Sequence, residues 1–178
     1  MICRNCGTSN NDDAKFCTKC GETFDSKQIN KPLGMKWFKF IIYIQLIIAF
    51  LLNLYSAYRL YSGEIYFDGT RYLVDQVYTA FPALRYIDMM FMIVSIGMAV
   101  LSIFVRQKLV KYRTNAVKLY LSFLILNGLI SLLYCGATSL ATGINTFDVN
   151  VLRTVVQNLF LFFYSNDYFR KRKHLFVN

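Results

Sequence analysis

Four cysteines near the start of the chain have the residue type and spacing of a metal site. They form two Cys-x-x-Cys pairs, Cys3 with Cys6 and Cys17 with Cys20, and a glycine directly follows each pair. A Cys-x-x-Cys turn brings two thiolates onto one metal ion, and the glycine supplies the positive φ that lets backbone N–H groups point at sulfur. Two such pairs supply four thiolates, which is the ligand set of a tetrahedral zinc site. The spacing therefore predicts one zinc ion held by Cys3, Cys6, Cys17 and Cys20.

The predicted metal site is structural, because four protein ligands leave zinc no open position for water or substrate. A segment of about 20 residues buries too little core to fold alone, so the metal must supply its folding free energy. An iron centre of the rubredoxin type uses similar spacing and stays the alternative occupant. The fifth cysteine, Cys135, stands alone in an apolar stretch and is expected to be a small buried side chain and not a ligand.

Enzymatic activity and nucleic-acid binding are not expected. His174 is the only histidine, and no set of nucleophile, base and orienting acid is recognisable, so we name no catalytic or cofactor-binding residue. Residues 1–24, which we call the head, contain three basic and three acidic side chains. Because phosphate neutralisation provides most of the affinity for nucleic acid, a head without net charge is a poor binder. A protein partner in the cytosol, or a regulatory contact of the head with the membrane body, is the better expectation.

The remaining chain is apolar enough to lie in a bilayer. Of its 178 residues, 56% are hydrophobic and 17% are aromatic, and the mean hydropathy is +0.37. These values are too high for a soluble domain of this length. A helix crosses about 30 Å of hydrocarbon at about 1.5 Å per residue. Three uncharged stretches approach or exceed that length: Phe40–Tyr58, Met89–Val105 and Leu119–Phe147.

A fourth apolar stretch, Thr154–Asn166, is only 13 residues long and lies between Arg153 and Asp167. It becomes long enough to cross if both charged side chains extend to their own interfaces. A re-entrant or surface helix is the alternative. We predict a mainly α fold, a four-transmembrane-helix bundle with a small N-terminal β zinc ribbon. The four predicted spans are, approximately, residues 37–59, 83–105, 117–140 and 147–169.

The basic residues predict the topology. Sixteen of the twenty Lys and Arg residues lie in the head and linker, in the loop between the second and third spans, and in the tail. The positive-inside rule therefore places both termini in the cytoplasm. A reducing compartment, which keeps metal-binding cysteines free, agrees with this placement. Residues 25–36 are a polar linker between the head and a membrane domain over residues 37–178, and we expect the first span to act as the insertion signal.

The first outer loop has a helical pattern of its own. Leu73, Val77 and Phe81 recur at intervals of four, which predicts an amphipathic helix on the outer leaflet. Pro82 suits the first turn of the helix that follows. The loop is either a ligand or peptide sensor or a tyrosine-rich interfacial lid, and the lid is favoured.

Polar side chains also recur at helical intervals within the predicted spans, among them Gln45, Asn53, Asn127, Gln157 and Asn158. Such residues usually hold helices together through hydrogen bonds worth about 0.6 kcal/mol on average. A polar path for a solute is the alternative. Because no acidic or basic residue lies deep in the apolar stretches, where proton-coupled transporters keep them, packing is favoured.

The pattern M-x-C-x2-C-G…F-C-x2-C-G is similar to the zinc-ribbon module that opens many prokaryotic membrane proteins. The body, from about Leu33 to Asn178, resembles the domain of unknown function 2569 family, which are four-span bacterial inner-membrane proteins. The resemblance rests on the long first outer loop, the basic stretch Phe104–Arg113 and a last span that begins near Arg153 and ends in a basic cluster and Phe176. The family's tryptophan–proline pair is absent from that span. The resemblance implies a prokaryotic plasma membrane location and no established activity.

Two functions from different classes are compatible with these features. The first, which we favour, is a non-enzymatic interaction, sensing or regulatory protein whose head binds a cytosolic protein. The alternative is a transport or channel-like component, or a membrane immunity protein against a pore-forming toxin. The sequence implies the lipid bilayer as a partner and is compatible with a homo-oligomer, which no residue specifies.

Overall fold

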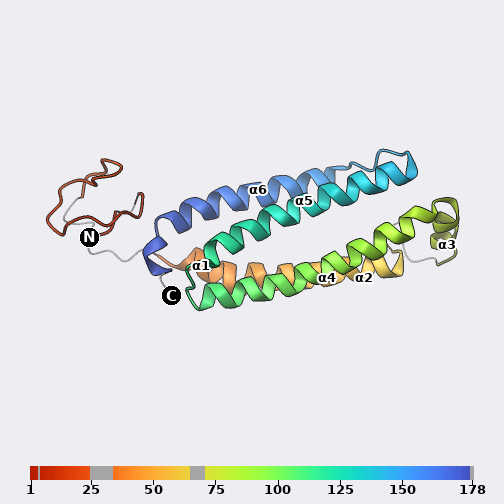
Figure 1. The fold of residues 1–178 in the computed structure, drawn as a ribbon, viewed down its shortest axis with the longest axis horizontal. Coiled ribbons are helices and arrows are strands. Elements are labelled where there is room, and N and C mark those ends of the chain that lie inside the picture. The colour runs from red at the N-terminus through yellow and green to blue at the C-terminus, as the bar shows by residue number, and fades with distance from the viewer. Residues whose placement is uncertain (4, 25–33, 65–70, 177–178) are drawn as a thin grey trace.

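The computed structural model of the protein describes residues 1–3, 5–24, 34–64 and 71–176. It is mainly helical, with the head beside one end of a long helical body (Figure 1). Most of the predicted linker over residues 25–36 lies outside the described residues. The helical elements are α1 (Lys36–Phe40), the π-helical turn η1 (Ile41–Gln45), α2 (Leu46–Ser62), α3 (Arg71–Ala80), α4 (Pro82–Val110), α5 (Ala116–Thr142), α6 (Val149–Arg170) and the 3₁₀ turn η2 (Lys173–Leu175).

Among the described residues, three helices are long and apolar enough to cross a membrane. They are the continuous helix Lys36–Ser62, which contains α1, η1 and α2, together with α4 and α5. The first three predicted spans fall on these helices. The fourth, 147–169, coincides with α6, a 22-residue helix that is not among the three. Polar residues such as Asn150, Gln157 and Asn158 lower the hydropathy of α6, and the fourth span stays a prediction.

The long helices pack as two hairpins. The contacts join α2 to α4, α4 to α5 and α5 to α6, and at the head end the start of the first helix also contacts α6 through Trp37 and Tyr164. In Figure 1 the hairpins lie close together near both chain termini and diverge toward α3. We call these the head end and the α3 end.

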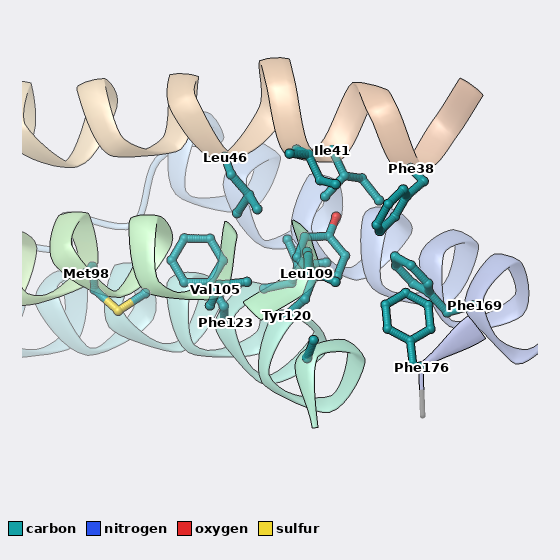
Figure 2. Packing of buried hydrophobic residues seen from close by; sticks show 13 residues of the cluster. Phe38, Ile41, Leu46, Met98, Val105, Leu109, Tyr120, Phe123, Phe169 and Phe176 are labelled. Carbon is teal, nitrogen blue, oxygen red and sulfur yellow. The ribbon is translucent and has the colours of Figure 1, made fainter. Parts of the chain in front are cut away.

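The apolar core is concentrated at the head end (Figure 2). Phe38 from α1, Phe169 from α6 and Phe176 from the tail meet edge to face, with ring centroids 5.6 to 6.1 Å apart. Edge-to-face pairs contribute about 0.5–1.5 kcal/mol beyond the area that they bury. Tyr120 of α5 joins this cluster at 5.9 Å from Phe169 and is completely buried. The core therefore ties both hairpins to the tail.

Polar groups of the first helix are satisfied by its neighbours. Within the π-helical turn η1, the Ile42 carbonyl accepts a hydrogen bond from Nε of Arg106 in α4, at 3.0 Å. The Gln45 side-chain carbonyl accepts from the Tyr120 hydroxyl at 2.8 Å. Buried polar groups are costly unless they are paired, so these bonds let a widened helical turn lie in an apolar core.

At the α3 end, an acidic side chain is buried inside a predicted span. Asp88 of α4 is only 2% exposed, and its carboxylate accepts hydrogen bonds from the Tyr78 hydroxyl of α3 at 2.9 Å and the Tyr134 hydroxyl of α5 at 3.0 Å. It lies six residues after Pro82, about 9 Å along the helix, and therefore near the end and not the middle of α4. The predicted outer-loop helix is present as α3, and Pro82 occupies the first turn of α4.

The core at the head end predicts unequal effects for two phenylalanines of α6. Phe169 is 2% exposed and Phe163 is 66% exposed. We expect Phe169→Ala to lower the unfolding free energy by about 3–5 kcal/mol, because it leaves a cavity, and Phe163→Ala to change it by about 0.5 kcal/mol or less. Thermal unfolding in one detergent would measure both. Equal shifts in the melting temperature would contradict this placement of the core.

Candidate metal centre

The structure brings the four predicted ligands together. Their sulfur atoms all lie within 4.8 Å of one another, and the Cys3–Cys20 and Cys6–Cys17 pairs are 3.5 Å apart. A tetrahedral zinc site with bonds of about 2.3 Å has sulfur–sulfur edges of about 3.8 Å, so small adjustments fit the ion. None of these cysteines is in a disulfide. In the described part of the chain, this is the only group of three or more candidate ligands.

The two Cys-x-x-Cys turns, or knuckles, have the same backbone hydrogen bonds. In the first, the Cys3 N–H donates to the Thr8 carbonyl and the Gly7 N–H donates to the Cys3 carbonyl, both at 2.9 Å. The second knuckle repeats both bonds around Gly21, at 2.7 and 3.0 Å. Gly7 and Gly21 both have a φ of 71°, a conformation that glycine adopts without steric cost. The glycine after each cysteine pair is therefore needed for the turn, as the sequence predicts.

The predicted β ribbon is reduced to two isolated antiparallel bridges in the described residues of the head. Ile2 pairs with Ser9, and Phe16 pairs with Thr23. In each knuckle the paired residues are only seven positions apart, and a turn occupies the space between them. The chain has no room for extended strands there, so the metal must hold the two knuckles together.

Asn10 links the two knuckles, although the cysteine spacing does not single it out. Its side-chain oxygen accepts hydrogen bonds from the backbone N–H and the hydroxyl of Thr18, at 2.8 and 2.9 Å. Its amide nitrogen donates to the Thr8 carbonyl at 2.9 Å and lies 3.5 Å from the Cys17 sulfur. Such outer-sphere donors orient ligands and stabilise thiolate charge. In the sequence, Asn10 stands in a polar run that looks like an ordinary loop.

The sulfur atoms have very different acidities. Burial opposes ionisation of Cys17, but the N–H groups of Cys20 and Lys19 outweigh burial and lower the pKa of Cys17 to about 6. The N–H of Glu22 favours the Cys20 thiolate, yet burial and the three neighbouring sulfurs raise the pKa of Cys20 to about 12. Four thiolates this close repel one another, and a divalent cation removes that obstacle. The cluster is therefore suited to a cation.

A comparison with protein families agrees with this geometry. Residues 2–23 match a family model described as a zinc-ribbon domain. The match contains all four cysteines, so the head is a zinc ribbon with one structural zinc ion. No match is found among curated proteins or solved structures. The family match ends before the first helix, so the resemblance of the helical body to the domain of unknown function 2569 family stays a hypothesis.

The zinc ribbon contacts the body at the end of α6. A Cβ atom added to Gly7 would lie 2.5 Å from the Arg170 carbonyl oxygen and 3.9 Å from the Cα atom of Lys171. A Cβ atom added to Gly21 would have nothing within 4 Å. The two knuckles are alike in their internal bonds, and this contact distinguishes them.

The segment that leads into the first helix is fixed at the same place. The Arg172 guanidinium donates to the Gly34 carbonyl at 2.9 Å and to the Tyr168 carbonyl at 3.0 Å. Its central carbon lies 3.7 Å from the centre of the Tyr168 ring, in a cation–π contact. Arg172 is 92% buried as a result, since its exposed fraction is 8%. The end of α6 therefore contacts the ribbon, and the tail after it contacts the end of the linker.

Zinc binding should release protons, because zinc ligates thiolates while Cys20, with its pKa of about 12, is a thiol at neutral pH without the metal. We expect one zinc ion per chain and a weaker apparent affinity as the pH falls from 8 toward 6. Titration of the chelator-treated, reduced full-length protein in weakly buffered detergent, with a pH indicator, measures the protons. Replacing Cys135 by Ala should change neither the number of zinc ions bound nor the number of protons released. Stoichiometric binding without proton release would contradict the all-thiolate site.

Alanine substitutions at the two knuckle glycines should differ in one respect. Both substitutions place a side chain at a residue with positive φ, which costs about 1–2 kcal/mol in each case. Only in Gly7→Ala does the new methyl group also clash with the Arg170 carbonyl oxygen. We expect similar zinc retention for both variants but faster proteolysis of the linker in Gly7→Ala. Limited proteolysis in detergent, read by mass spectrometry, makes the comparison with Gly21→Ala as the matched control. Equal linker cleavage in the two variants would show that the contact does not hold the ribbon.

Proposed function

We propose that the protein is a non-enzymatic interaction, sensing or regulatory protein of the membrane, and that its zinc ribbon binds a cytosolic protein. The observation that carries this proposal is the placement of a closed four-cysteine site at one end of a helical body long and apolar enough to cross a bilayer. A site with four protein ligands supports folding and leaves no position for a reaction. Its contribution is then the surface that it folds.

That surface has an apolar residue of the kind that protein partners bind. Phe16 is 60% exposed, and Ile2, in the other knuckle, is 39% exposed. Exposed aromatic residues commonly dominate binding energy in protein interfaces. The head has no net charge, which favours a protein partner over nucleic acid.

The proposal includes a crossing by α6, which would place both termini in the cytoplasm of a prokaryotic cell. α6 lies along α5 and contacts it, and its 22 residues extend about 33 Å, close to the thickness of the hydrocarbon. Arg153 lies near one end of the helix and Asp167 near the other. Each can reach its own interface, so neither charge needs to lie at the centre of the bilayer.

Transport receives less support from the side chains. Asn127 donates to the Phe123 carbonyl at 3.1 Å, and Asn158 donates to the Thr154 carbonyl at 2.8 Å. Each amide is thus bonded to its own helix and is not offered to a solute. A Cβ atom added to Gly128 of α5 would lie 3.8 Å from the Cβ atom of Asn158. Asn158 therefore lies against a small residue of α5, which favours a role in packing α5 on α6.

The partner can be tested with full-length protein that is crosslinked in intact cells and captured through a C-terminal tag. We expect Phe16→Ser to reduce capture of the main partner about tenfold or more, because interface anchors contribute 2 kcal/mol or more. Asp13→Ser, at an exposed polar position of the same head, is the matched control and should leave capture unchanged. Zinc content of both variants confirms that the ribbon is folded.

The double variant Cys3→Ser, Cys6→Ser should lose zinc and the same partner together. The proposed function would be overturned if Phe16→Ser and the zinc-free variant both captured the same partners as the unmodified protein, at the same yield. A reporter fused to the C-terminus tests the crossing by α6 separately, because an odd number of spans would place it outside the cell.

A further inference from the structure

α6 has a polar stripe on the surface that α5 does not cover. Asn150, Arg153 and Gln157 are all exposed, and the spacing of three and four residues places them on one face of the helix. Phe160 and Tyr164 continue the stripe toward the head end and are 65% and 49% exposed. Ser165 and Phe169, which lie about 80° and 120° around the helix from Gln157, are buried against the body. At the head end the stripe meets the first helix, because the Tyr164 and Trp37 rings lie 4.7 Å apart, edge to face. Toward the α3 end the two hairpins diverge (Figure 1), and Asn150, Arg153 and Gln157 are exposed there.

The side-chain amide of Gln157 lacks a hydrogen bond among the described residues. By contrast, Asn53 bonds the Ala49 carbonyl at 2.8 Å, and Gln45 accepts from Tyr120 at 2.8 Å. Asn127 and Asn158 bond their own helices. Gln157 therefore differs from the amides whose bonding the chain completes internally.

The position of Gln157 along α6 makes this difference costly in a bilayer. If α6 crosses, as proposed above, Gln157 lies about 4 Å from the midpoint of the helix, too far from either interface for its side chain to reach water. An amide without a partner in hydrocarbon is strongly disfavoured. Arg153 lies about 10 Å from the midpoint, and its longer side chain reaches the headgroups. The unsatisfied group is therefore Gln157.

We propose that a second copy of this chain packs on α6 and that the two Gln157 amides hydrogen-bond to each other across a two-fold axis. An amide has both a donor and an acceptor, so it complements its own copy. Two copies inserted with the same topology carry Gln157 at the same depth, and a two-fold axis along the membrane normal brings the pair together. An unrelated partner would need a polar group at that depth independently. Phe160 supplies apolar contact area beside the amide pair.

The inference rests on the proposed crossing by α6, and not on the proposed partner of the zinc ribbon. Two full-length copies with different tags are co-expressed, extracted in mild detergent and captured through one tag, and the fraction of the other tag is measured. Gln157→Leu should weaken the dimer about three- to tenfold, the value expected for two interhelical hydrogen bonds. Gln157→Asn keeps an amide and should retain most of the dimer. Asn158→Leu, which removes an amide bonded within its own helix, is the control and should not change capture.

A photoactivatable benzoylphenylalanine locates the interface in native membranes without added cysteines. Placed at position 157 it should give a crosslinked dimer of the chain. At position 159 it should not, because Leu159 is 47% exposed at nearly the same depth on another face of α6. The dimer would be overturned if Gln157→Leu left the captured fraction of the second tag unchanged. It would also be overturned if position 157 crosslinked only to lipid, to α2 of the same chain or to a different protein.

The C-terminal reporter distinguishes the two ways in which this inference fails. A cytoplasmic tail together with a monomer would refute the dimer and leave the four-span proposal standing. A tail outside the cell would refute the crossing by α6 and the dimer that rests on it.

Discussion

The packing of Phe38, Phe169 and Phe176 joins parts of the chain that the sequence separates widely. These rings come from the start of the first long helix, the end of the last one and the tail. This core joins the two hairpins at the head end (Figure 1), and the Asp88–Tyr134 hydrogen bond joins α4 to α5 nearer the α3 end. The end of α6 provides the Arg170 carbonyl, which contacts the zinc ribbon, and the tail provides the Arg172 guanidinium, which binds the Gly34 carbonyl at the end of the linker. The position of the ribbon therefore depends on an aromatic cluster outside it.

The two parts of the protein are stabilised by different physical means. The ribbon has two bridges and few buried side chains, and a metal ion compensates for its small core. The body exposes large apolar side chains along every long helix, as suits a surface in contact with lipid. Neither interaction can replace the other, because contact with lipid does not hold the two knuckles together and zinc binding does not cover the apolar surface of the helices. Removal of the metal by a chelator should consequently destabilise the ribbon, and exchange of the detergent should change the stability of the helical body.

Local sequence patterns predicted the features that depend on local spacing. The four ligands, the knuckle glycines, three helices able to cross a membrane and the helix of the outer loop all follow from recognisable residue spacing. Bonds between residues that no spacing pattern links could not be predicted in the same way. The bonds of Asn10 to Thr18 and of Asp88 to Tyr78 and Tyr134 depend on how separate segments pack. The β ribbon was overestimated, because each knuckle is too short for strands.

The π-helical turn in the first helix also sets the direction in which that helix presents its side chains. Phe38 and Leu46 are eight residues apart, and in an uninterrupted α-helix they would point about 80° away from each other. A π turn takes up roughly one extra residue, which reduces the angle to about 20°. Both side chains then belong to one buried cluster, in which Phe38 contacts the tail (Figure 2). The widened turn thus rotates the side chains of one continuous helix, so that Phe38 packs on the aromatic cluster and Leu46 belongs to the same buried core.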